Sequence, residues 1–130
     1  MGYTTEFEGQ IDLDPPLNAS EILAIQTFSN ERHDETPEDR EVMPGAWCHW
    51  IAQVDGDALE WDGGEKFYHA AEWMQLVLDR FITPLGISAN GTIEAQGEEA
   101  GDLWRIVVKD NVVRTIYPKI VWDEYDEEDM

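Results

Sequence analysis

The sequence is poor in cysteine and in long apolar stretches. Its single cysteine, Cys48, excludes an internal disulfide bond. No apolar run approaches the roughly 18 residues that a membrane-spanning helix needs, and no charged-then-apolar signal pattern is present. We therefore expect a cytoplasmic protein without membrane contacts. The 130 residues are enough for one domain with a sizeable core.

Catalytic, metal-binding and phosphate-binding motifs are missing as well. The chain has no Cys-x-x-Cys pair, no His-Glu-x-x-His, no glycine-rich phosphate loop and no Gly-x-Ser-x-Gly turn. A run beginning at Asp55 opens like a calcium loop, but Glu60 replaces the required glycine and Lys66 occupies the closing position. The sequence thus predicts no metal site, no cofactor and no enzymatic activity.

One enzymatic alternative involves Cys48 and His69. A nucleophilic thiol needs a nearby base, and His49 cannot serve because neighbouring residues of a strand point to opposite faces. Free cysteines are commonly buried, so we interpret Cys48 as a core residue. His69 is interpreted as a packed or surface residue of a helix, and His33 lies in a segment expected to be a loop.

Basic residues are scarce, and the charge is unevenly distributed. The chain has 29 acidic and eight basic residues, a formal charge of −21. Residues 1–65 hold 16 acids and two bases, residues 66–122 hold seven acids and six bases, and the last eight hold six acids and no base. Such a field excludes direct affinity for nucleic acids or anionic membranes and favours a basic partner.

The first segment with a clear period is residues 3–14, where apolar and acidic residues alternate as in a half-buried strand. Alternate residues of a strand are about 6.7 Å apart, so one face would carry a line of carboxylates with spacing of the order of that between backbone phosphates. The predicted partner-binding residues of this line are Glu6, Glu8, Asp12 and Asp14.

The middle of the chain predicts two helices and a hairpin. A helix should start after Asn18, which has the spacing of a capping box, and end near Asn30. Residues 47–54 and 59–61 form the hairpin. Asp62 would cap a central helix from Glu65 to Ile82, ended by Pro84 and Gly86. Residues 31–46 are expected to be an acidic mobile loop, and they contribute further predicted partner-binding residues, namely Asp34, Glu35, Glu38 and Asp39.

Three strands complete the prediction, at residues 92–96, 103–109 and 112–120. The order β-α-β-β-α-β-β-β favours an α+β fold in which an antiparallel sheet of five to six strands carries two helices on one face. Residues 1–122 would form this single domain, and residues 123–130 an acidic disordered tail. Trp122 and Tyr125, which have little sequence downstream to bury them, are the last predicted partner-binding residues.

Two sequence signatures resemble those of a group of small uncharacterised bacterial and phage proteins. The first is the opening MGYTT with Phe7 and Gly9, and the second is EWDGGEKFY at residues 60–68. The resemblance implies a shared fold. It implies no activity, because the group has no established function.

The segregated charge therefore carries the functional hypothesis. We expect a non-enzymatic inhibitor that binds a basic nucleic-acid-binding protein or complex by mimicking phosphate charge, as a phage-encoded antagonist of host defence would. The protein would act as a monomer or homodimer. An immunity protein against a nuclease toxin is an alternative from the same binding class. A housekeeping domain whose acidity reflects a high-salt environment is another, since only three lysines occur.

Overall fold

Two long strands form the centre of the fold. The computed structural model describes residues 3–123. In it, β1 (Glu6–Asp14) pairs antiparallel with β4 (Ser88–Gln96) along its whole length. Gly9 lies opposite Ile93, and Gly91 lies opposite Ile11. A Cβ atom on Gly9 would lie 2.5 Å from the Thr92 carbonyl oxygen, so this close approach of the two strands requires glycine.

Four shorter strands extend the sheet on both sides. They are β2 (Trp50–Ala52), β3 (Ala58–Trp61), β5 (Leu103–Lys109) and β6 (Val112–Ile116), and the order across the sheet is β2-β3-β1-β4-β5-β6. All pairs are antiparallel. β4 starts four residues earlier than predicted, and β6 ends at Ile116 instead of residue 120.

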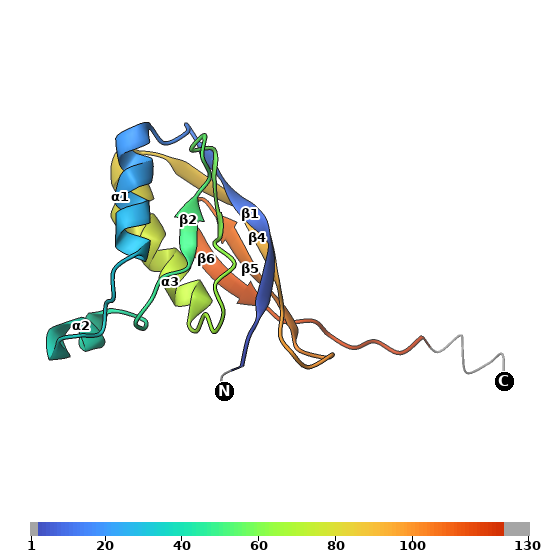
Figure 1. Ribbon diagram of the computed structural model, residues 1–130. Coiled ribbons are helices and arrows are strands. Elements are labelled where there is room, and N and C mark those ends of the chain that lie inside the picture. Colours follow the sequence, from blue (N-terminus) through green and yellow to red (C-terminus); the bar gives the residue numbers. More distant parts are fainter. Residues whose placement is uncertain (1–2, 124–130) are drawn as a thin grey trace.

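The helices cover one face of this sheet (Figure 1). α1 (Ala19–Ser29) begins at Asn18 with the predicted capping box, in which Asn18 and Glu21 satisfy each other's backbone N–H groups. α3 (Ala70–Val77) continues through a π-helical turn, η1 (Leu78–Ile82), and a 3₁₀ turn, η2 (Thr83–Leu85), to Gly86 at φ 74°. The predicted α+β fold with an antiparallel sheet is confirmed.

The prediction that the central helix starts at Glu65 is wrong. The helix begins at Ala70, and both Lys66 and His69 have positive φ angles. Phe67 explains the delay, because its buried ring lies among Phe7, His49 and Trp50 and holds residues 65–69 in an irregular loop. The Asp62 carboxylate caps no helix and accepts a hydrogen bond from the Gly64 N–H instead.

Residues 31–46, expected to be an acidic mobile loop, include one short helix. They contain α2 (Pro37–Val42), which starts at Thr36 with a side-chain cap on the Asp39 N–H. His33 is buried against the rings of Phe28 and Trp73, and its backbone N–H donates to the Ala46 carbonyl. The segment is thus tied to the core at both ends of α2. The sequence did not predict this attachment to the core, because a single buried histidine produces no apolar periodicity.

The face of the sheet under the helices forms the hydrophobic core. Its largest fully buried side chains include Trp50 and Trp73, and the Trp50 Nε1 donates to the Ala70 carbonyl oxygen at 2.8 Å. Among residues 3–123, no helix combines the length and the apolar character needed to traverse a lipid bilayer.

Candidate partner-binding surface

The outer face of β1 carries the predicted line of carboxylates. Phe7, Ile11 and Leu13 point into the core, whereas Glu6, Glu8, Asp12 and Asp14 are exposed on the opposite face. Gln10 stands between them and donates to the Asp12 Oδ1 at 2.7 Å. Within the described chain, no ion pair joins any of these four carboxylates to a basic side chain. The line is therefore available to cations from another molecule.

The neighbouring strand β4 widens this acidic face only slightly. Its residues opposite the line are mostly neutral, because Glu6 pairs with Gln96, Asp12 with Asn90, and Asp14 with Ser88. Glu8 lies opposite Glu94, but the Glu94 carboxylate forms an ion pair with Arg105 of β5 at 3.0 Å. The acidic character thus ends at β4, and β5 begins a basic region of the same sheet.

The turn between β2 and β3 adds acid at the other end of β1. The Leu13 N–H donates to the Asp57 carbonyl oxygen at 2.7 Å, which places this turn beside Asp12 and Asp14. The pKa of Asp57 is raised, first by a hydrogen bond with Asp55, then by the charge of Asp55, and to a smaller extent by that of Asp12. Carboxylates are therefore close enough here for their mutual repulsion to favour protonation.

The predicted acidic residues of residues 31–46 do not join this line. α2 lies beside the helices, away from β1 (Figure 1). Asp34 is engaged within the chain, because Arg32 donates to its carboxylate at 2.6 Å and lowers its pKa. Glu35 and Glu38 are exposed and Asp39 is partly exposed around α2. The two acidic groups are therefore separate surfaces.

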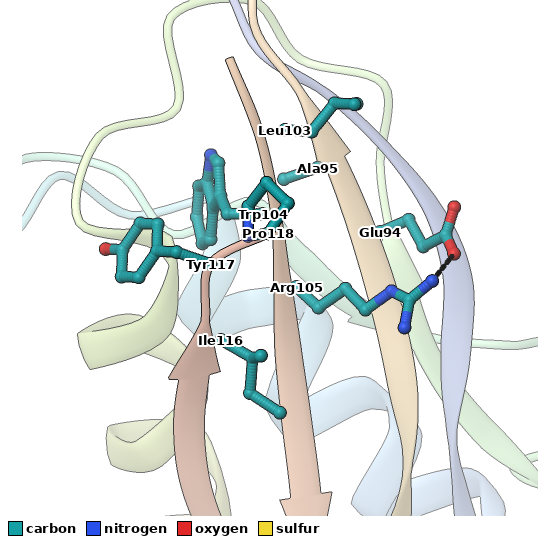
Figure 2. A pocket seen from close by; sticks show the side chains of 8 residues that line it. All are labelled: Glu94, Ala95, Leu103, Trp104, Arg105, Ile116, Tyr117 and Pro118. Atoms are coloured by element: carbon teal, nitrogen blue, oxygen red, sulfur yellow. Dashed lines mark ion pairs between the residues drawn. The ribbon is translucent and has the colours of Figure 1, made fainter. Parts of the chain in front are cut away.

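Trp122 follows β6, the edge strand that β4 and β5 separate from β1. Trp122 is 83% exposed at the end of the extended segment that follows β6. Tyr125 lies outside the described residues. A mainly apolar hollow of about 240 Å³ lies where this segment leaves β6 (Figure 2). It is lined by Leu103, Trp104, Ile116, Tyr117 and Pro118.

One polar pair escaped the sequence analysis. β2 and β3 bring His49 beside Asp62, with Nδ1 at 3.0 Å from both carboxylate oxygens. The register in which Trp50 lies opposite Trp61 continues to these two residues, and the Asp62 N–H donates to the His49 carbonyl oxygen at 3.0 Å. His69 is exposed, and its Nδ1 lies 3.2 Å from the carboxylate of the exposed Glu72.

The interpretation of Cys48 as a core residue is confirmed. Its side chain is fully buried, and burial raises the pKa of its thiol to about 12. In the part of the chain that the structure describes, no three His, Cys, Asp or Glu side chains are grouped as metal ligands.

Comparison with known sequences gives one result. The family described as "Family of unknown function (DUF6205)" matches residues 1–130. The chain belongs to this family. No curated protein and no solved structure matches the chain. Membership in an uncharacterised family agrees with the resemblance carried by the opening residues and by residues 60–68, and it assigns no activity to any residue.

Proposed function

We propose that this protein is a non-enzymatic cytoplasmic inhibitor that binds a basic nucleic-acid-processing protein by presenting carboxylates in place of phosphates. The observation that carries the proposal is the outer face of β1. There Glu6, Glu8, Asp12 and Asp14 are exposed and unpaired among the described residues. Rigid placement supports this role, because β1 is held on both sides by β3 and β4.

The chemistry of such a contact defines the partner. Burying several carboxylates costs free energy unless lysine or arginine meets each of them, so the partner must offer a dense basic groove. Both molecules then release counterions, and the complex weakens as salt is added. A phage-encoded antagonist of a host defence nuclease fits this description, and so does an immunity protein against a nuclease toxin.

The test compares two sets of charge-neutralising substitutions. The first set is Glu6→Gln, Glu8→Gln, Asp12→Asn and Asp14→Asn on β1. The control removes the same charge near α2 through Glu35→Gln, Glu38→Gln, Asp39→Asn and Glu41→Gln. Each form is immobilised to retain proteins from a bacterial lysate, with excess duplex DNA as competitor, and any retained nuclease is assayed for inhibition.

We expect the wild type and the α2 set to retain and inhibit one basic nuclease, DNA to release it, and the β1 set to bind at least about tenfold more weakly. Equal inhibition by the β1 set would refute the proposed surface. Tight binding to one cognate nuclease toxin, with no binding to other nucleases, would favour the immunity-protein alternative over the phage antagonist.

A further inference from the structure

The segment after β6 exposes four large apolar side chains within six residues. Its exposed fractions are 69% for Tyr117, 81% for Ile120, 79% for Val121 and 83% for Trp122. It runs on from β6 and projects away from the body of the molecule (Figure 1). We call residues 117–122 the apolar arm. Large apolar side chains that a chain leaves uncovered together commonly mark a contact with another molecule.

The arm continues the free edge of β6, and the register shows which backbone groups lie on that edge. Asp110 and Asn111, both with positive φ, form a two-residue turn. The residues that flank this turn, Lys109 and Val112, therefore exchange backbone hydrogen bonds with each other. Backbone groups alternate along a strand, so the N–H groups of residues 113, 115 and 117 face away from β5.

Two contacts agree with this assignment. The Gln75 side chain of α3 accepts from the Val113 N–H at 2.9 Å and donates to the Asn111 carbonyl oxygen at 3.0 Å, so it occupies the start of the outer edge. Pro118, an even-numbered residue, has its backbone on the other side of the strand, towards β5. Its missing N–H would have faced β5, which explains why pairing with β5 ends at Ile116 while the outer edge continues. Among residues 3–123, no strand pairs with this outer edge from Thr115 onward.

Charge makes this side of the molecule the easiest for another copy to approach. Residues 103–122 contain four basic residues and one acidic residue, a net charge of +3, whereas the other residues sum to −24. A symmetric approach through the acidic residues of the N-terminal half would instead bring two negative surfaces together.

We propose that two copies of the chain dock through this edge, antiparallel, with the twofold axis at Tyr117. Thr115 of each copy then pairs with Lys119 of the other, and the two sheets become continuous. On the face of the sheet that the helices do not cover, this register brings exposed side chains of the two copies together. Ile116 lies opposite Pro118 of the other copy, and Arg114 lies beside its Ile120 and Trp122. A register centred on Arg114 is disfavoured because it opposes two arginines and meets Gln75.

The primary test is sedimentation velocity of the full chain between about 1 µM and 1 mM, the affinity range of a small interface. We expect the mass to rise from 14.9 kDa towards twice that value. Dimerisation should strengthen as salt screens the net charge of −21. Binding to a basic partner has the opposite salt dependence, so failure here leaves the proposed function standing, and the reverse also holds.

Two variants test the edge itself. Tyr117→Pro removes the N–H at the axis without touching a residue of β6, and Ile120→Asp places a charge in the contact. Each should weaken dimerisation at least about tenfold. Val54→Asp is the matched control, because Val54 is 98% exposed beside the turn between β2 and β3. Circular dichroism verifies that each variant is folded.

A disulfide trap fixes the register. Tyr117→Cys should form a crosslinked dimer under mild oxidation, since paired residues at such an axis have Cα atoms about 5.5 Å apart. Cys48 is buried and contributes no background, and Val54→Cys is the exposed control. A monomeric mass at every concentration, or a dimer that survives Tyr117→Pro and does not crosslink through Tyr117→Cys, overturns the proposal.

Discussion

Burial decides the chemistry of Cys48. Its side chain is inaccessible, and the loss of hydration raises the thiol pKa to about 12, because the apolar surroundings disfavour the thiolate. We predict that the native protein does not react with a thiol reagent near pH 8, whereas the denatured chain reacts completely. Spectrophotometric thiol titration measures both. Reaction of the native protein at the rate of a free cysteine would contradict this burial.

A hydrogen bond with the Asp55 carboxyl group, together with the charge of Asp55, decides the behaviour of Asp57. Its pKa is raised by Asp55, so the folded state holds this proton more tightly than the unfolded state does. Stability is then lost as the pH rises from the ordinary value of about 3.9 through the raised value. Asp57→Asn should therefore increase the thermal midpoint at neutral pH and low salt.

The same substitution should have little effect near pH 3, where the carboxyl group is already protonated. Glu41→Gln, on an exposed residue of α2, is the control for simple loss of one charge. Differential scanning calorimetry at two pH values measures the effect. A larger gain for Glu41→Gln than for Asp57→Asn would show that local repulsion at this turn is not the cause.

At the scale of elements, the pairing of β1 with β4 depends on Gly9. A side chain there would collide with the Thr92 carbonyl, and the backbone φ of 112° is unfavourable for other residues. We predict that Gly9→Ala lowers the free energy of unfolding by about 3 kcal/mol. Gly63→Ala, where φ is also positive but no atom lies within 4 Å, should cost only about 1 kcal/mol. Urea denaturation compares the two, and equal losses would refute the steric explanation.

The edge of β6 depends on Gln75. Its amide replaces a neighbouring strand for Asn111 and Val113. We predict that Gln75→Ala lowers stability by about 1–2 kcal/mol, since it leaves a backbone donor and an acceptor without partners. The Val113 amide should exchange its hydrogen faster, as hydrogen exchange followed by NMR would show. Gln26→Ala on the exposed surface of α1 is the control, and it should leave that amide unchanged.

At the scale of the whole molecule, the charge of −21 opposes the folded state. We predict that the thermal midpoint rises steeply with sodium chloride up to about 0.15–0.3 M, where the Debye length falls below about 8 Å, and then levels off. A midpoint that continues to rise into molar salt would instead favour a domain adapted to a saline environment.

The sequence predicted those elements whose signals are local. The alternation of residues 3–14, the capping box at Asn18 and the turn before Val112 each determine a structure within a few residues. The start of α3 was missed because Phe67 is drawn into an aromatic cluster with residues from β1 and β2. α2 was missed because a single histidine, buried against distant rings, anchors it.

By itself, the sequence determined the composition of the acidic line and the face of β1 on which it lies, because a period of two leaves only one arrangement. Only the tertiary structure decided which carboxylates are unpaired. Arg105 reaches Glu94, Arg32 reaches Asp34, and no basic side chain of residues 3–123 forms an ion pair with the line on β1. The Arg32 pair is local, but strand order places Arg105 beside Glu94, and strand order depends on contacts between residues far apart in the chain.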